Sequence, residues 1–248
     1  MSNGVADYPI KLSIDYPDRK LNKLTSFFRI FIVLPIGFVA ALFVSGLPSG
    51  SSYTSYTISN QEVNDFFAKY FASGAEAPDI IALLMAAAFL APIVLFIIGF
   101  IANLFNPVVL MLVFRQKYPK WWFDYYVMLL KFFSRIFSYL MLLTDVYPST
   151  DEEQNVHIEI PYPDAKKDLS QGLPLIKWFL AIPHYIVLFF VAFAAVICDV
   201  FIWFAILFTG YAPKGLFDFI VGFYRWSVRV LAYASFQFTD KYPPFKLE

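Results

Sequence analysis

The chain has 248 residues, of which 59% are hydrophobic and only 15% are charged, and its formal net charge is zero. A soluble domain of this length has no way to bury so many apolar side chains, so the composition excludes an ordinary soluble protein and predicts an integral membrane protein. The single cysteine, Cys198, excludes an internal disulfide, and no basic tail is present that would favour nucleic acid as a partner.

Two short segments alternate apolar and polar residues with the period of a β-strand. The apolar positions are Ile10, Leu12, Ile14 and Tyr16 in the first segment, and Val156, Ile158 and Ile160 in the second. An isolated strand leaves backbone N–H and C=O groups unpaired. We therefore expect the two segments to pair with each other, antiparallel, as a minor two-strand β element on the cytoplasmic side.

Three apolar runs, at 27–44, 80–105 and 175–208, are long enough for membrane-spanning helices. The first run is not a signal peptide, because the polar and charged residues 1–26 precede it. Residues 45–79 are rich in Gly, Ser and Tyr and are expected to form an outer loop between the first two runs. The third run has only Cys198 and Asp199 as a polar break, so it is either a hairpin of two short helices or one long helix bent at Pro183.

Several motifs of the first half recur in the second half. The pattern Thr-Asp-x-Tyr-Pro stands at 144–148 and at 239–243, and a cation with Pro six positions later opens an apolar run at 29–35 and at 177–183. These matches predict two tandem repeat units. The first unit, at 1–150, would contain a strand, a membrane hairpin with the outer loop 45–79, and an interfacial helix at 119–145. The second unit, at 151–248, would contain a strand, a membrane hairpin at 175–209, and an interfacial helix at 214–239.

Four spans, two in each unit, place all but Lys69 of the 19 Lys and Arg residues on one side of the membrane. The positive-inside rule makes that side cytoplasmic and puts both termini there. Six spans would bury Lys131, Arg135, Arg225 and Arg229 in the bilayer, at a cost of roughly 2.5–3.5 kcal/mol each. The sequence thus predicts an all-α integral membrane protein with about four transmembrane helices and two amphipathic interfacial helices.

Each predicted interfacial helix carries a narrow charged stripe on a mostly apolar surface. Asp124, Lys131 and Arg135 stand at i, i+7 and i+11, and Asp218, Arg225 and Arg229 repeat this spacing. Paired cations favour phosphate oxygens, so the stripes are candidate contacts for lipid head groups or for an acidic partner. The alternative is a wetted helix face on which Asp and Arg residues pair between the two units.

Other polar positions are candidates for a site inside the membrane. His184, Asn103 and Asn106 could line a polar path, but a hydrogen-bonded structural histidine and a kink at Asn106-Pro107 are simpler interpretations. Asp199 is expected at the outer turn of the second hairpin, exposed to solvent.

The outer loop contains its own short helical pattern at 60–71. Phe66, Phe67, Tyr70 and Phe71 gather on one side of this predicted helix. That apolar side is expected to contact a partner or to rest on the outer leaflet. Because the second unit has no such segment, it is the feature most particular to this chain.

The motifs of the second half, with one near the N-terminus, carry a family resemblance. They read "WFLAIPHYIVLFF", "FIWFAILFTG", "KGLFDFIVGFYRW", "RVLAYASFQFTDKYPPF" and "YPIKLSIDYPD". Together they resemble the prokaryotic membrane family called domain of unknown function 4389. The resemblance implies a membrane fold in two tandem units, of which the second is closest to the family pattern. It implies no assigned activity and no catalytic residues.

No clustered catalytic set, phosphate-binding glycine loop or metal-ligand spacing is present in the sequence. We therefore expect a non-enzymatic polytopic protein of the prokaryotic cytoplasmic membrane, without a cofactor or metal. Its partners would be the lipid bilayer and other membrane protein subunits, and its role that of a scaffold or accessory subunit of a larger membrane complex. The alternative is a small transporter, channel or lipid-handling protein that uses the cleft between the two units.

Overall fold

The computed structural model describes residues 8–45, 97, 101, 106–152 and 154–248. All the helices and strands named below belong to one compact unit, formed by Met1–Ser45 and Asn103–Glu248. Of the span predicted at 80–105, only residues 97 and 101 are described. Three sequence predictions lie outside the described residues: the outer loop, the outer-loop contacts and the polar site at Asn103. The outer-loop contacts are Phe66, Phe67, Tyr70 and Phe71.

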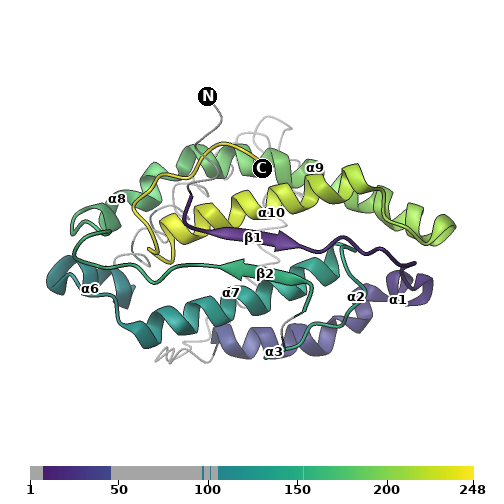
Figure 1. The fold of residues 1–248 in the computed structure, drawn as a ribbon, viewed down its shortest axis with the longest axis horizontal. Helices are drawn as coiled ribbons and strands as arrows, with labels where there is room; N and C mark the ends of the chain where they lie inside the picture. The colour runs from purple at the N-terminus through teal and green to yellow at the C-terminus, as the bar shows by residue number, and fades with distance from the viewer. Residues whose placement is uncertain (1–7, 46–96, 98–100, 102–105, 153) are drawn as a thin grey trace, which may run out of the picture. The chain divides into compact units, whose positions relative to one another are not determined.

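The described chain is mostly helical and contains a two-stranded sheet (Figure 1), which confirms the predicted helical class with a minor β element. The strands are β1 (Lys11–Ile14) and β2 (Val156–Glu159). The helices are α1 (Lys23–Phe27), α2 (Arg29–Ile32), α3 (Leu34–Ser45), α6 (Pro107–Arg115), α7 (Lys120–Leu140), α8 (Leu173–Leu180), α9 (Ile182–Thr209) and α10 (Lys214–Ala234).

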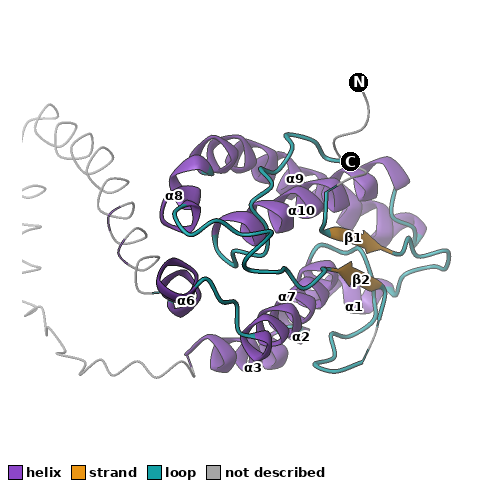
Figure 2. Cartoon of the chain, turned by 60° about the vertical axis from the view of Figure 1, so that its left-hand side comes forward, coloured by secondary structure: helices purple, strands orange, loops and turns teal. Residues whose placement is uncertain are grey.

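β1 and β2 pair antiparallel, with Leu12 opposite Ile158 and Ser13 opposite His157, which confirms the predicted pairing. Leu12 and Ile158 are buried because β1 packs on α10 and β2 packs on α7. The alternate residues, Ser13 and His157 among them, are exposed. One side of the sheet is therefore apolar and covered, and the other is polar and open. Figure 2 shows the strands on the opposite side of the unit from α6 and α8.

The third apolar run is a bent helix rather than a hairpin. α8 and α9 meet at a bend just before Pro183, and α9 then continues without a turn through Cys198 and Asp199. It ends where Gly210 adopts a left-handed conformation, with a φ of 84°. The membrane hairpin predicted at 175–209 is therefore wrong, and so is the exposed turn at Asp199. A tight turn needs residues such as Gly or Pro, and neither flanks Cys198 and Asp199.

Within the described part of the chain, the helical stretch Leu173–Thr209 is the one long and apolar enough to cross a bilayer. The first predicted span, at 27–44, is divided among α1, α2 and α3. Pro35 separates α2 from α3, because it lacks the N–H that would bond to the Phe31 carbonyl. The prediction of four spans required a hairpin in each unit, and the described residues supply one helix of spanning length.

α7 and α10 are the two helices that were predicted to lie at the membrane interface. Each has 21 residues and begins directly after a proline with extended backbone, Pro119 or Pro213. Both end before the predicted limits of 145 and 239, because Leu142 and Gln237 have positive φ angles of 55° and 59° that turn the chain out of the helix. The Thr-Asp-x-Tyr-Pro motifs therefore lie beyond the helices rather than in their last turns.

Gly222 on α10 lies against the C-terminal segment of the chain. A Cβ atom there would come within 2.7 Å of the Leu247 carbonyl oxygen, whereas a Cβ atom at Gly215 would meet nothing within 4 Å.

We expect Gly222→Ala to lift the C-terminal segment off α10 and to destabilise the protein by about 1–3 kcal/mol. Faster amide hydrogen exchange at residues 245–248 would measure this release. Gly215→Ala is the matched control and should stabilise α10 by about 0.5–1 kcal/mol; equal behaviour of the two variants would contradict the close packing.

Candidate functional site

Two cations are buried where the apolar helices begin. Arg29 of α2 is only 3% exposed, and Lys177 of α8 is 0% exposed. A buried charge is costly unless hydrogen-bond acceptors or an opposite charge compensate it. The partners of these two side chains therefore decide how the surrounding helices pack.

Arg29 binds the chain at the end of α7. Its Nη1 donates hydrogen bonds to the carbonyl oxygens of Tyr139 and Thr144, both at 2.6 Å. The guanidinium also lies over the Tyr139 ring, 4.4 Å from the ring centroid. These contacts fasten α2 to the segment that follows α7.

Lys177 binds the chain at the end of α10 in a similar way. Its Nζ donates a hydrogen bond to the Thr239 carbonyl oxygen at 2.9 Å and lies 5.3 Å from the centroid of the Tyr233 ring. The same Nζ forms an ion pair of 2.7 Å with the carboxylate of Asp240. Thr239 and Asp240 therefore supply both a carbonyl acceptor and a counter-ion for the buried lysine.

The two Thr-Asp-x-Tyr-Pro motifs make matching contacts. Tyr147 of the first motif packs edge-on against Tyr139, with ring centroids 5.7 Å apart, and Tyr242 of the second packs edge-on against Tyr233 at 5.6 Å. Taken from the sequence alone, the motif is only a sign of the repeat. In the structure, its threonine carbonyl also binds a buried cation that is distant in the sequence.

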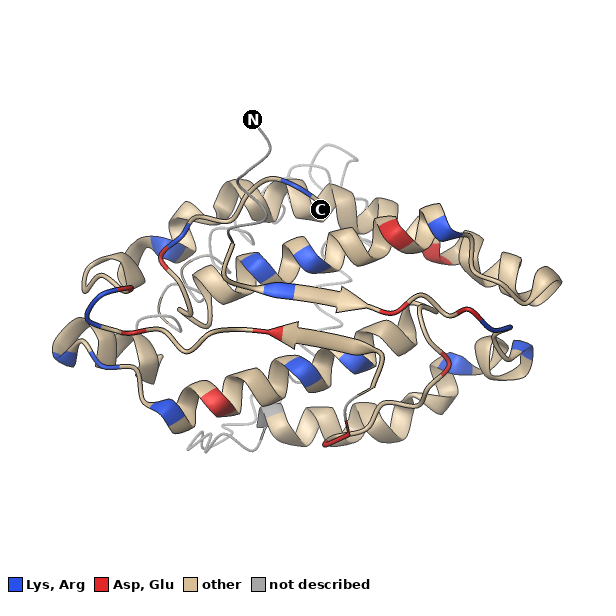
Figure 3. Cartoon of the chain, in the orientation of Figure 1, with Lys and Arg blue, Asp and Glu red and all other residues tan. Residues whose placement is uncertain are grey.

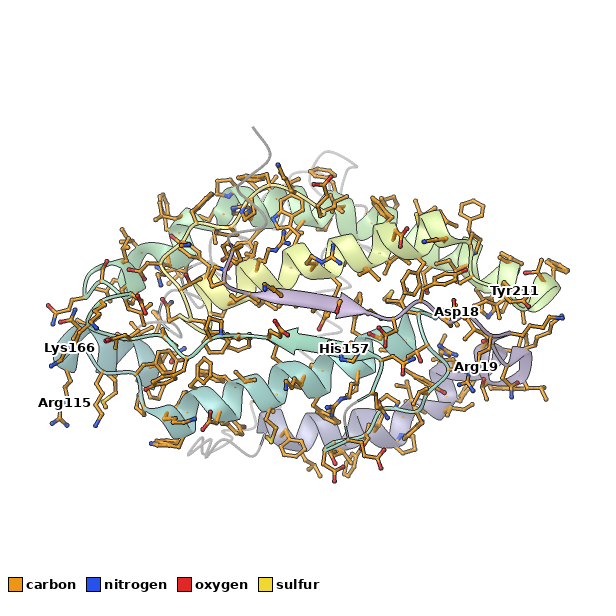
Figure 4. The ribbon with its side chains drawn as sticks, in the orientation of Figure 1. Asp18, Arg19, Arg115, His157, Lys166 and Tyr211 are labelled. Atoms are coloured by element: carbon orange, nitrogen blue, oxygen red, sulfur yellow. The ribbon has the colours of Figure 1, made fainter. Side chains whose placement is uncertain are left out.

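The two motifs differ in what their aspartates do. Asp240 neutralises the buried Lys177, but Asp145 pairs with Arg19 at 2.8 Å, and the Arg19 side chain is 68% exposed (Figure 4). Arg29 is thus bound by carbonyl oxygens and an aromatic ring, without an ion pair to the neighbouring Asp145. The first half of the chain therefore contains a buried cation with no direct counter-ion among the described residues.

A cavity of about 400 Å³ adjoins Arg29 and is lined by residues of α1, α2, α9 and the end of α7. Its apolar walls include Phe27, Ile30, Leu142, Val200, Trp203 and Phe204. Asp199 also lines it, from within α9. Nε and Nη2 of Arg29 and Oδ1 of Asp199 are buried and have no hydrogen-bond partner among the described residues. The structure therefore brings together two opposite charges that the sequence separates by 170 positions.

The two arginines of the charged stripe on α10 make hydrogen bonds to backbone carbonyls of other segments. Arg225 Nε donates a hydrogen bond to the Leu12 carbonyl of β1 at 2.9 Å, and Arg229 Nη1 donates one to the Lys246 carbonyl at 3.5 Å. Burial lowers the pKa of the Arg229 guanidinium, and the nearby charge of Arg225 lowers it further, although arginine stays charged at neutral pH. Asp218 is exposed. Figure 3 shows Lys and Arg residues along α10 beside the strands.

The stripe of α7 lines an open groove. Arg135 Nη1 donates a hydrogen bond to the Ser149 carbonyl at 2.9 Å, and Asp124 forms an ion pair of 3.1 Å with Lys120. Lys131 is half-buried. Asp124, Lys131 and Arg135 together line a groove of about 390 Å³. The structure therefore brings the three predicted α7 residues to one place on the surface.

His184 and Asn106, which were predicted for a polar path, have separate structural contacts. His184 is fully buried; its Nδ1 accepts a hydrogen bond from Trp226 Nε1 at 3.1 Å, and its ring stacks on Phe245 with centroids 3.8 Å apart. Asn106 caps α6, because its Oδ1 accepts a hydrogen bond from the Val108 N–H at 3.0 Å. His184 thus makes the contacts of a hydrogen-bonded structural histidine, whereas the kink expected at Asn106-Pro107 involves residues before 106 that the structure does not describe.

The sequence prediction did not include Arg29, Lys177 or Asp199 among the site residues. A signal for the two cations was present, since each opens an apolar run and each run is followed, after an amphipathic helix, by a Thr-Asp pair. Asp199 is an acidic residue in the middle of a long apolar run, a position that favours a functional role. The assumption of a hairpin turn assigned it to solvent instead.

The fold defines a mostly helical protein with one apolar helix of membrane-spanning length among its described residues. Residues 174–246, which cover α9, α10 and nearly all of α8, match the family model described as "Domain of unknown function (DUF4389)". This match confirms the predicted resemblance for the second half of the chain. Comparison with curated proteins and with solved structures gives no match.

The two Thr-Asp pairs allow a matched test of the buried cations. Asp240→Asn removes the counter-ion of the fully buried Lys177, and we expect a loss of about 3–5 kcal/mol of unfolding free energy. Asp145→Asn removes the partner of the exposed Arg19 and should cost less than about 1 kcal/mol. Thermal or denaturant unfolding of the purified protein in detergent measures both. Equal losses would show that burial of Lys177 does not control stability.

Proposed function

We propose that the protein is a non-enzymatic membrane protein that is held in the bilayer by α9 and the helices beside it. The apolar surface of α9 carries this proposal. Only 11% of the most apolar stretch of 18 residues within Leu173–Thr209 is buried inside the protein. The large exposed side chains of α9 include Phe189, Phe190, Phe193, Phe201, Phe204 and Phe208. An exposed apolar surface of this extent requires lipid or partner helices to cover it.

The ends of α9 support a placement in which both lie on the cytoplasmic side. At its C-terminal end, Lys23 donates a hydrogen bond to the Phe208 carbonyl at 3.1 Å, and Lys20 lies 5.8 Å from the centroid of the Tyr211 ring. Lys177 precedes the other end. The positive-inside rule favours the cytoplasmic side for cations at both ends. α9 would then lie in the cytoplasmic leaflet, with both of its ends at the cytoplasmic surface, without crossing the bilayer.

The sheet supports the same orientation. α10 runs alongside α9, and β1 runs beside α10 (Figure 1). The open side of the sheet carries Lys11, His157 and Glu159, which need water. A membrane parallel to these helices keeps the charged side of the sheet in the cytoplasm and the outer surface of α9 in lipid.

The two tandem units, the membrane location and the crossing segments predicted from the sequence form part of this proposal. The matching contacts of Arg29 and Lys177 support two tandem units, at 1–150 and 151–248. The location would be the prokaryotic cytoplasmic membrane, with both termini in the cytoplasm. Segments that cross the bilayer would come from the apolar runs at 27–44 and 80–105.

As its role we propose a scaffold or accessory subunit of a larger membrane complex. The exposed side chains of α9 and α3, such as Phe38 and Leu42 of α3, offer a surface for the helices of other membrane protein subunits. The alternative role as a small transporter, channel or lipid-handling protein has one supporting observation, the cavity between Arg29 and Asp199. That cavity favours lipid handling among these three.

Cysteine labelling tests the placement of α9. In a Cys198→Ser background, single cysteines would replace Lys167 before α8 and Lys214 after α9, both of which are exposed. We expect both positions to react with a membrane-impermeant maleimide from the cytoplasmic side alone, because both ends of α9 lie there. Lys11→Cys, on the open side of the sheet, is the cytoplasmic reference. Reaction of the first two positions from opposite sides of the membrane would show that α9 crosses it.

Purification from the native membrane tests the proposed role. We expect the tagged full chain, extracted in mild detergent, to carry other membrane proteins in stoichiometric amounts, identified by mass spectrometry. A double variant, Phe190→Ala with Phe193→Ala, should reduce their recovery several-fold because it removes two large exposed side chains of α9. Recovery of the chain alone, with lipid bound, would overturn the scaffold role and support lipid handling.

A further inference from the structure

The cavity beside Arg29 differs from a packing defect because its walls hold charged groups without partners. Only 3% of the Arg29 surface is exposed, and its Nε and Nη2 have no hydrogen-bond acceptor among the described residues. Its Nη1 is held by two carbonyl oxygens at 2.6 Å, which anchors the guanidinium. The remaining N–H groups are therefore held in a fixed position as donors on the cavity wall.

Asp199 contributes the opposite charge from α9. Its Oδ1 is buried and has no hydrogen-bond partner within the described part of the chain, where Asp199 and Arg29 also form no ion pair. Two buried charges that do not meet leave a desolvation cost uncompensated. A ligand that accepts hydrogen bonds at one end of its polar group and donates them at the other would compensate both charges.

The apolar walls of the cavity continue into the exposed surface. Phe27 of α1 is 54% exposed, Ile30 of α2 is 73% exposed, and Phe204 of α9 is 47% exposed. Trp203 stacks on Phe27 within this wall, with centroids 6.0 Å apart. A ligand with an apolar chain can therefore enter from the bilayer and leave its chain along these side chains. The volume of about 400 Å³ lies in the range of small-ligand pockets and suits a polar head with the start of a chain.

We propose that this cavity binds a zwitterionic phospholipid with a primary amine in its head group. The phosphate oxygens accept hydrogen bonds from Nε and Nη2 of Arg29, and the ammonium donates to Oδ1 of Asp199. The acyl chain lies against Phe27, Trp203 and Phe204. A choline head has no N–H to donate to Asp199, and a glycerol head has no positive charge, so both satisfy the site only in part. The inference rests on the membrane placement proposed above.

Native mass spectrometry of the full chain in detergent tests the proposal. The probes are phosphatidylethanolamine, phosphatidylcholine and phosphatidylglycerol with identical acyl chains. We expect phosphatidylethanolamine to bind at least tenfold more tightly than the other two. Asp199→Asn should reduce that preference about tenfold, because it removes the carboxylate charge and keeps the side-chain volume. Equal binding of the three lipids, or an unchanged preference in Asp199→Asn, would overturn the proposal.

Two aromatic truncations on α9 separate the cavity from the general lipid surface. Trp203→Ala removes a cavity wall and should weaken phosphatidylethanolamine binding several-fold. Phe189→Ala removes a side chain that is 71% exposed and does not line the cavity, and it should leave binding unchanged. Equal loss in both variants would show adsorption to the apolar surface and would overturn a specific site. Unchanged melting temperatures of all variants exclude misfolding as the cause.

The membrane placement and the lipid site can fail separately. Extraction of native membranes with alkaline carbonate should leave the chain in the membrane pellet. Release into the supernatant would refute the placement itself, and with it the route by which lipid reaches the cavity. Retention in the pellet together with equal binding of the three lipids would overturn the lipid site alone.

Discussion

The need to satisfy two buried cations constrains the packing of the described chain. Arg29 and Lys177 stand at the start of apolar helices, where water does not reach them. Each finds its acceptor in the segment after an amphipathic helix, so that the start of one helix and the end of another are held together. Desolvation of a charge costs several kcal/mol, which is comparable with the stability of a whole domain. These contacts therefore hold α7 and α10 against the apolar helices.

The cavity arises from one difference between the two halves. In the second half Asp240 reaches Lys177, and the buried charge is neutralised within the chain. In the first half Asp145 pairs with Arg19, and two of the Arg29 nitrogens have no hydrogen-bond acceptor among the residues that the structure describes. Asp199, which has no counterpart in the first apolar run, then supplies a negative charge from α9. A site for an external ligand thus exists where the internal pairing is incomplete.

Local patterns in the sequence were sufficient to predict the strand pair, α7, α10 and the family. The strands follow from strict alternation, and both helices begin after a proline and carry a stripe at helical spacing. The uninterrupted α9 was one of two alternatives that the sequence left open, because a long apolar run is compatible with one helix or with two. The helix ends depended on the left-handed residues Leu142 and Gln237, which are not glycine. The cavity could not be predicted, because Arg29 and Asp199 meet only through tertiary packing.

The pairing of β1 with β2 has a consequence for the order of events during synthesis. β1 is made first, and its partner follows only after roughly 140 residues, which takes on the order of 7–28 s at about 5–20 residues per second. During that interval the edge of β1 has no strand to pair with, and Arg29 has no Thr144 to bind until the ribosome has passed α7. The N-terminal half therefore leaves the ribosome with an open strand edge, and the hydrogen bond that anchors Arg29 cannot form before Thr144 has been made.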